Sequence, residues 1–198
     1  MLEGNIGFLS TDNSVVNNFA NQIHNAIHEM DSRSTIKGWI VDLRNNNGGN
    51  MWPMVLGLQP LIGNEVPGYF VNANQNKPPV WKINSPLFGL TIKEPYQLKN
   101  PNSKIALLYS KRTSSSGEMT AICFIGKPDA KSFGEITAGL TPGNRIFYLS
   151  EDIILVLASS YTMDRNKKVY TGSIIPDVLI EKPGNDNVLQ QAITWLKE

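Results

Sequence analysis

The sequence has almost none of the residues that bind metals or form covalent cross-links. Cys123 is the single cysteine among 198 residues, which excludes an internal disulfide and a multi-cysteine metal site. Only two histidines, His24 and His28, are available as general bases near neutral pH. Gly48-Gly49 lacks the Lys-Ser/Thr that would complete a phosphate-binding loop. We therefore expect neither a bound metal nor a cofactor.

Charged residues and long apolar runs are also scarce. Charged residues make up 18% of the chain, against a usual share of ~25%. The 18 Lys and Arg nearly balance the 17 Asp and Glu, so there is no basic stripe and a nucleic acid is not an expected partner. No apolar run approaches the ~18 residues of a membrane span, and the first residues do not resemble a signal peptide. Hydrophobic residues nevertheless reach 41%, enough for the core of one domain.

Apolar strands alternate with helical patterns along most of the chain. Apolar residues recur at steps of three and four over residues 15–30, which predicts a helix. The run Trp39–Val41 does not alternate with polar residues, which predicts a strand buried on both faces. The order of elements favours an α/β fold with a mostly parallel sheet flanked by helices.

The remaining elements follow from the same patterns. Strands are expected at residues 5–10, 36–43, 103–109, 132–137 and 178–181, a hairpin at 145–149 with 153–160, and helices at 51–61, 118–125 and 187–197. Residues 64–103 contain six prolines, so we expect an irregular excursion there, with a hairpin from strand-like pieces at 68–72 and 80–83.

Two segments share one design, an apolar strand followed by a turn of small residues and then a helix. The first turn holds Gly48 and Gly49, and the second reads Thr-Ser-Ser-Ser-Gly over residues 113–117. If both strands lie parallel in one sheet, both turns lie at its carboxyl edge, where open α/β sheets bind ligands. Backbone N–H groups of a Gly-Gly turn suit a developing oxyanion, and a serine at the start of the next helix would face them.

Each turn taken alone also fits a purely structural role. Ser115 and Glu118 match the S-x-x-E capping box, in which they only satisfy backbone donors at the start of a helix. A Gly-Gly pair after a strand is usually just a turn. At this level the sequence leaves both the catalytic and the structural interpretation open.

Four motifs in the same order resemble those of the C-terminal-processing (tail-specific) serine peptidases. Residues 42–49 are similar to the D-L-R-x-N-x-G-G signature of that family. Residues 113–119 resemble its T-A-S-[SA]-x-E nucleophile segment and, by ending in Glu-Met, are most similar to the nisin-resistance-type branch. Residues 134–139 match G-E-x-T-x-G, and residues 172–178 match G-x-x-x-P-D-[VI]. Together the motifs are highly specific.

The resemblance implies a ClpP/crotonase-like core, with residues 1–198 forming a peptidase catalytic domain. It implies hydrolysis near the C-termini of peptide or protein substrates by an acyl-enzyme mechanism. It assigns the nucleophile to Ser115, and the oxyanion hole to backbone N–H groups of Gly48, Gly49 and Ser116.

Further site residues and the location of the protein are indicated less directly. Ser114 stands where the common pattern has alanine. Glu118 and Glu135 are candidates for supporting roles, the latter to orient a base or to bind substrate. The chain itself does not indicate a location, whereas the family implies a bacterial protein outside the cytoplasm, with a membrane anchor upstream of Met1 as one arrangement.

The general base is where the sequence departs from the family pattern. Many members have a lysine directly after G-E-x-T-x-G, but this chain has Leu140, which cannot accept a proton. Histidine-type members carry the base in a D-G-H-S-like segment upstream of the first core strand, and that segment is not in this sequence. We therefore expect the base to lie outside this chain, which alone would hydrolyse peptides very slowly. The alternative is a non-catalytic module of the same fold that binds peptides or hydrophobic ligands.

Three residues within the chain could replace the missing base. His24 and His28 lie four residues apart and could bind a metal or accept a proton. Because their helix should cover the sheet with its polar face in solvent, we expect both to be surface residues without a catalytic role. Lys111, four residues before Ser115, is expected to be a solvated loop residue.

Overall fold

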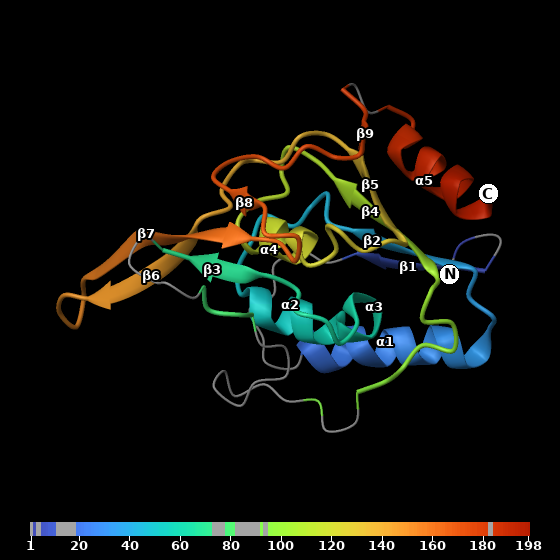
Figure 1. The fold of residues 1–198 in the computed structure, drawn as a ribbon, viewed down its shortest axis with the longest axis horizontal. Coiled ribbons are helices and arrows are strands. Elements are labelled where there is room, and N and C mark those ends of the chain that lie inside the picture. The colour runs from blue at the N-terminus through green and yellow to red at the C-terminus, as the bar shows by residue number, and fades with distance from the viewer. Residues whose placement is uncertain are drawn as a thin grey trace.

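The protein has a layered α/β core from which a long β-hairpin extends (Figure 1). The structure is a computed structural model that describes residues 2, 5–10, 19–72, 78–81, 92, 95–181 and 184–198. The predicted strand piece at 80–83 and the predicted helix start at residue 15 lie partly outside these residues.

A parallel sheet of five strands forms the centre of the core, with the order β1-β2-β4-β5-β9. The strands are β1 (Ile6–Ser10), β2 (Gly38–Asp42), β4 (Lys104–Tyr109), β5 (Ala130–Gly134) and β9 (Val178–Leu179). All four pairings are parallel, as the sequence predicts. Because β2 and β4 are direct neighbours, the turns that follow them leave the sheet side by side.

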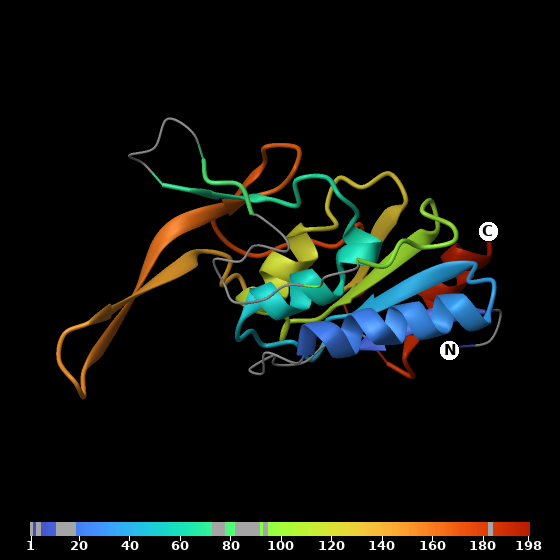
Figure 2. The ribbon, with the colours of Figure 1, turned by 90° about the horizontal axis from the view of Figure 1, so that it is seen from below.

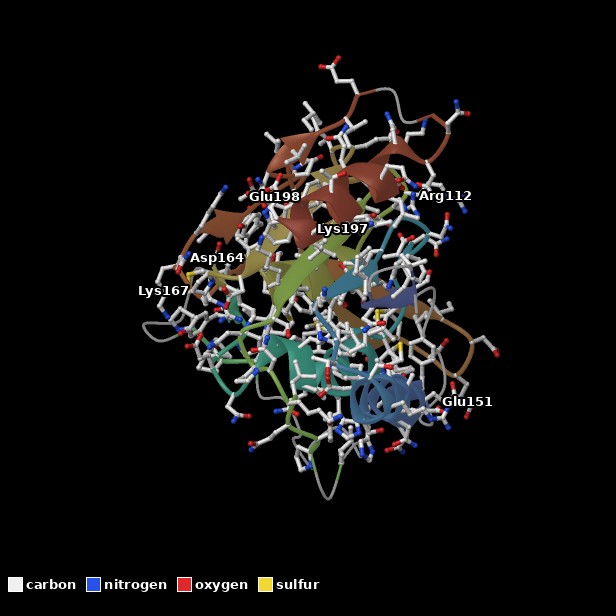
Figure 3. The ribbon with its side chains drawn as sticks, turned by 90° about the vertical axis from the view of Figure 1, so that its right-hand side faces the viewer. Arg112, Glu151, Asp164, Lys167, Lys197 and Glu198 are labelled. Carbon is white, nitrogen blue, oxygen red and sulfur yellow. The ribbon has the colours of Figure 1, made fainter. Side chains whose placement is uncertain are left out.

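Helices cover both faces of this sheet, and Figure 3 shows the layers with α5, which ends at Lys197, above the strands and α1 below them. The helices are α1 (Phe19–Arg33), α2 (Met51–Gly57), α3 (Gln59–Ile62), α4 (Ser116–Ile122) and α5 (Asn187–Lys197). Among the described residues, no helix is long and apolar enough to cross a membrane.

The two faces of the sheet belong to two hydrophobic cores. Trp39, Val41 and Leu107 pack with residues of α1, α2 and α4, whereas Ile40 and Leu108 pack with residues of α5. Successive residues of a strand point to opposite faces. A strand with a core on both sides therefore needs apolar residues without alternation, which explains the Trp39–Val41 run.

The structure has two helices, α2 and α3, where the sequence predicts one continuous helix at 51–61, so that prediction was wrong on this point. Pro60 lies in the first turn of α3, where a missing N–H costs no helical hydrogen bond. Deeper within one continuous helix, its ring would clash with the carbonyl one turn earlier, so the chain breaks at Leu58 and restarts. Gly57, which closes α2, packs so near α1 that a Cβ there would lie 2.7 Å from Cβ of Ile23.

A second, antiparallel sheet carries the predicted hairpin. Its strands are β3 (Tyr69–Val71), β6 (Gly143–Tyr148), β7 (Ile154–Met163) and β8 (Val169–Tyr170). We call the β6–β7 hairpin, residues 143–163, the arm; it projects well beyond the helices and the central sheet (Figure 2). Large apolar side chains are exposed along both arm strands, including Tyr148 at 79% and Ile154 at 57%. Within the Pro-rich excursion, Tyr69 forms an antiparallel bridge with Val80.

The structure corrects the expectation for one of the two histidines. His24 is only 5% exposed, and its Nε2 accepts a hydrogen bond from Tyr96 N at 2.8 Å. His28 is exposed as expected, with its ring 4.4 Å from that of Tyr96. The segment around Tyr96 crosses over α1, and Tyr96 Oη donates to Asp31. A contact between residues 72 positions apart leaves no periodic signal in the sequence.

Burial lowers the pKa of His24 below its usual value of 6.5, the more so because His28 lies nearby. The unfolded chain therefore takes up a proton at a higher pH than the folded one, and stability should fall as the pH drops below about 6.5. His24→Gln keeps an acceptor for Tyr96 N but cannot titrate, so it should flatten this dependence. Urea unfolding between about pH 5 and pH 8 measures the effect. The matched control is His28→Gln, which should keep most of the slope; an unchanged slope in His24→Gln would contradict the assignment.

Candidate active site

The turns after β2 and β4 meet at the carboxyl edge of the sheet and are joined by hydrogen bonds. Ser114 N donates to Asn46 O at 3.0 Å, and Ser114 Oγ donates to Asn47 O at 2.9 Å. Ser116 Oγ donates to Gly49 O at 2.7 Å. The predicted juxtaposition of the Gly-Gly turn with the serine segment is therefore confirmed.

Ser115 has a backbone conformation that side chains rarely adopt. Its φ is 52° and its ψ is −120°, directly before the first residue of α4. A non-glycine residue held in such a region costs on the order of 1–3 kcal/mol, and such residues cluster at functional sites. Ser115 N donates to Glu118 Oε2 at 2.9 Å, and Ser115 O accepts from Met119 N at 3.0 Å. The first turn of α4 therefore holds both the backbone N–H and the backbone carbonyl of the strained residue.

The three consecutive serines differ in what their hydroxyls do. The Ser114 and Ser116 hydroxyls each donate to a carbonyl of the facing turn, and both residues are buried. Among the described residues, no carbonyl accepts the Ser115 hydroxyl, and Ser115 lines a cavity. Ser115 is thus the serine best placed to react with a bound molecule.

Gly48 and Gly49 both have positive φ, 114° and 112°. A Cβ on Gly48 would lie 3.0 Å from Ser115 Cβ and 3.4 Å from Ser115 Oγ. The Gly48 N–H donates to Asn46 Oδ1 at 3.1 Å, so in this conformation it is already used within its own turn. Ser116 N lies in the first turn of a helix, where N–H groups have no acceptor within the helix.

Asn46 is a site residue that the sequence analysis missed. It is fully buried, its Oδ1 holds Gly48 N, and its Nδ2 donates to Met54 Sδ at 3.1 Å. A Cβ on Gly117 would lie 2.5 Å from the backbone oxygen of Asn46 and 2.8 Å from its Oδ1, so α4 begins directly against this residue. The fixed Asn in the D-L-R-x-N-x-G-G signature was the available signal.

Glu118 is a fully buried carboxylate with four donors around it. Besides Ser115 N, it accepts hydrogen bonds from Thr137 Oγ1, Gly139 N and Leu140 N. Its bond to Ser115 N is the capping interaction that the S-x-x-E spacing predicts. The bonds from Thr137 and Gly139 tie the Ser115 segment to the G-E-x-T-x-G motif, and Leu140 directly follows that motif, so Glu118 joins two motifs that are distant in the sequence. The Leu140 side chain, in the family's lysine position, is 59% exposed.

Glu135 and Lys111 lie at a different hollow from that of Ser115. Glu135 Oε2 accepts a long hydrogen bond of 3.4 Å from Lys111 N, and both residues line a hollow with Arg44 and Arg112. Neither lines the cavity at Ser115. The structure therefore does not bring Glu135 to the cavity in which a base or substrate would meet Ser115.

The cavity in front of Ser115 has a volume of about 670 Å³. Residues of α2 and α4 line one side of it and residues at the base of the arm line the other. Six large apolar side chains line it: Met51, Trp52, Phe70, Met119, Ile146 and Val156. In the described part of the chain, no group of three His, Cys, Asp or Glu residues could hold a metal ion.

Comparison with known proteins identifies the family. The model of peptidase family S41 matches residues 5–180. The chain belongs to peptidase family S41. Its members are peptidases, and the match confirms the family and the fold class indicated by the four motifs. A nisin-resistance protein from Lactococcus lactis subsp. lactis is 33% identical to this S41 chain over 206 residues, which cover 99% of the chain and 61% of that protein. The S41 chain thus spans less than two thirds of this relative.

Solved structures agree with this assignment. A lipoprotein from Streptococcus agalactiae superposes with a TM-score of 0.80 at 30% identity, over the whole S41 chain and 68% of the lipoprotein. The photosystem II D1 C-terminal processing protease superposes with a TM-score of 0.68 at 17% identity, over the whole S41 chain and 49% of that protease. At 17% identity, the similarity to this protease shows a shared fold.

The contact between Gly48 and Ser115 predicts the effect of a substitution. Gly48→Ala adds both backbone strain and a Cβ pressed against Ser115, whereas Gly63→Ala adds strain at a φ of 88° with only the flexible end of Lys127 nearby. We expect Gly48→Ala to be less stable than Gly63→Ala by about 1–3 kcal/mol, the usual cost of overpacking. Urea unfolding of both variants beside the wild type measures this difference. Equal losses of stability in the two variants would contradict the prediction, because they would show that the Gly48 turn can move away from Ser115 at little cost.

Proposed function

We propose that the chain is a serine peptidase core that cleaves peptide or protein substrates near their C-termini through an acyl-enzyme on Ser115. The observation that carries the proposal is the strained backbone of Ser115, at a φ of 52°, facing both the Gly48 turn and an open cavity. Membership of a peptidase family supports the reaction class. The likeness to a C-terminal processing protease supports the position of cleavage.

The proposed reaction begins when Ser115 Oγ attacks the carbonyl carbon of the scissile bond and a base takes the hydroxyl proton. The carbonyl oxygen becomes negatively charged, and we assign the N–H groups of Gly49 and Ser116 as its donors. The predicted third donor, Gly48 N, would first have to break its hydrogen bond to Asn46 Oδ1. Collapse of the intermediate breaks the C–N bond, and the amine leaves with a proton. Water then hydrolyses the acyl group from Ser115.

The base in this proposal comes from outside residues 1–198. His24, on α1, is hydrogen-bonded to Tyr96 N, and the position of the family's lysine is occupied by the exposed Leu140. Lys111 lines another hollow. A histidine supplied by further sequence, as in the histidine-type branch of the family, would complete the site. Without it, a serine hydroxyl is a weak nucleophile at neutral pH.

We also propose that the protein acts outside the bacterial cytoplasm at a membrane surface. One relative is described as a lipoprotein and another as a nisin-resistance protein. Both descriptions fit a protein that meets peptides outside the cell.

A fluorophosphonate probe tests both the nucleophile and the missing base. The isolated chain should react slowly, because in another serine protease loss of the base lowers kcat by about 10⁶-fold. Added imidazole should raise the labelling rate in proportion to its concentration, since it can take the hydroxyl proton in place of the absent side chain. Mass spectrometry should find the label on Ser115 and not on Ser114 or Ser116.

Two variants complete this experiment. Ser115→Ala should abolish labelling while the chain stays folded, with its unfolding midpoint lowered by no more than the loss of an N-cap explains, and Ser32→Ala, on the exposed side of α1, should label like the wild type. Rapid labelling without imidazole would reveal a base within the chain, with Lys111 the first residue to mutate. No labelling at any imidazole concentration would reject the enzyme and favour the binding module.

A further inference from the structure

A second cavity, with a volume of about 550 Å³, lies away from Ser115. No described residue lines both this second cavity and the cavity at Ser115. Leu107 and Tyr109 of β4 and Ser132 of β5 line it, and β8 with parts of the segment 171–177 provides further walls. Leu107 and Tyr109 belong to the core that includes α4, so the second cavity lies on that face of the sheet. The function proposed for Ser115 leaves it without a role.

The hydroxyl of Tyr109 lacks a partner at the wall of the second cavity. Tyr109 is fully buried, and its Oη has no partner at hydrogen-bonding geometry among the described residues. Burial and the nearby charge of Asp177 raise the pKa of Tyr109, so the hydroxyl stays protonated and can donate. Asp177 and Ser132, which lie near this hydroxyl, both line the second cavity and not the hollow at Lys111, so Oη is directed to the second cavity. Buried polar groups without a partner are rare, and a bound molecule would supply one here.

Two opposite charges at the second cavity are also unpaired. Lys168 and Asp177 both line it, and neither forms a salt bridge with a described residue. Lys168 Nζ lies 5.2 Å from the centroid of the Tyr170 ring, which is part of the same wall. Asp177 Oδ2 accepts hydrogen bonds from N and Oγ of Ser132 at 2.8 and 2.7 Å, and no described residue donates to Oδ1. The third charged lining residue, Lys127, already donates to a carbonyl of α3.

A cavity with one available cation, one available anion and a free hydroxyl donor suits a short zwitterion. The ammonium of the ligand would meet Asp177, its carboxylate would meet Lys168, and Tyr109 would donate to a carbonyl between them. A volume of about 550 Å³ corresponds to a sphere roughly 10 Å across, or about three residues of extended peptide at ~3.3 Å each. Thr171 and Ser173 add further hydroxyl groups to the lining, so the side chains of the ligand should be small and polar.

We propose that the second cavity binds a hydrophilic dipeptide or tripeptide with both termini free, through Asp177, Lys168 and Tyr109. This site goes beyond the proposed function, because binding there requires no reaction at Ser115. Both termini are needed for recognition, so a longer chain that merely passes through the cavity is not a ligand.

The experiment measures the binding of the tripeptide Gly-Ser-Gly to the wild-type chain by isothermal titration calorimetry. The same measurement is made with an N-acetylated form and with a C-terminal amide, and mass spectrometry confirms that all three remain intact. The free tripeptide should bind about five- to tenfold more tightly than either capped form, because each cap removes one partly exposed charge pair.

Tyr109→Phe separates the role in binding from a role in folding. It removes a buried hydroxyl that has no partner, so the free chain should unfold at the same or a slightly higher urea concentration. The Kd of Gly-Ser-Gly should nevertheless rise about fivefold, as expected for one lost hydrogen bond. Tyr148→Phe, at a side chain exposed on the arm, is the matched control and should change neither quantity.

Lys168→Gln tests the carboxylate end of the ligand. It should make the free acid and the amide bind equally while the preference for a free amine remains. Lys37→Gln makes the same change in net charge at another exposed lysine and should keep both preferences.

Labelling of Ser115 by the fluorophosphonate in imidazole locates the bound tripeptide. A ligand in the second cavity leaves labelling in place at saturation, whereas a ligand in the cavity at Ser115 blocks it. Equal binding of free and capped forms, an unchanged Kd in Tyr109→Phe, no measurable binding, or blocked labelling would each overturn the inference. If Ser115 is never labelled, the proposed function fails, and the Kd values of the variants still decide for or against this site.

Discussion

The parallel pairing of β2 with β4 brings together the two turns on which the candidate active site is built. Asp42, the last residue of β2, lies opposite Leu108, one residue before the end of β4, so the two strands end almost level. Their turns therefore leave the same edge at the same height, and the Gly-Gly turn meets the serine turn. A shift of one residue would also turn Trp39 and Val41 toward the wrong core. The hydrophobic pattern of two buried strands thus fixes the meeting of two turns that lie several residues beyond them.

Glu118 shows how one buried residue can serve stability and positioning together. As part of a capping box it satisfies a donor at the start of α4, which is all that its spacing from Ser115 would require. Its three further donors come from residues 137–140, so the carboxylate also joins two loops. A buried carboxylate is costly unless it is well hydrogen-bonded. The structural and catalytic interpretations of S-x-x-E are therefore compatible, because the bonds that make Glu118 stable in the interior also hold Ser115 in its strained conformation.

Features that depend on local pattern could be predicted from the sequence, and features that depend on distant contacts could not. The two buried strands, the arm and α5 follow from periodicity, and the motifs predicted the meeting of Gly48 with Ser115. The burial of His24 depends on Tyr96, which approaches from a segment without periodic structure. The engagement of Gly48 N by Asn46 depends on a side-chain rotamer within a turn. The break between α2 and α3 could have been anticipated from Pro60, because its ring is incompatible with a continuous helix at that point.

The two walls of the cavity differ in mechanical character. The wall from α2 and α4 is backed by the central sheet and its hydrophobic core. The opposite wall belongs to the arm, and beyond the short pairing of β7 with β3 and β8 that arm is a ribbon of two strands with exposed apolar side chains. Two-stranded ribbons are only marginally stable on their own in water, and regions with few buried contacts open at low free energy. The cavity therefore has one rigid wall, which carries Ser115, and one compliant wall, so its width can adjust to side chains of different size while Ser115 stays beside the Gly48-Gly49 turn.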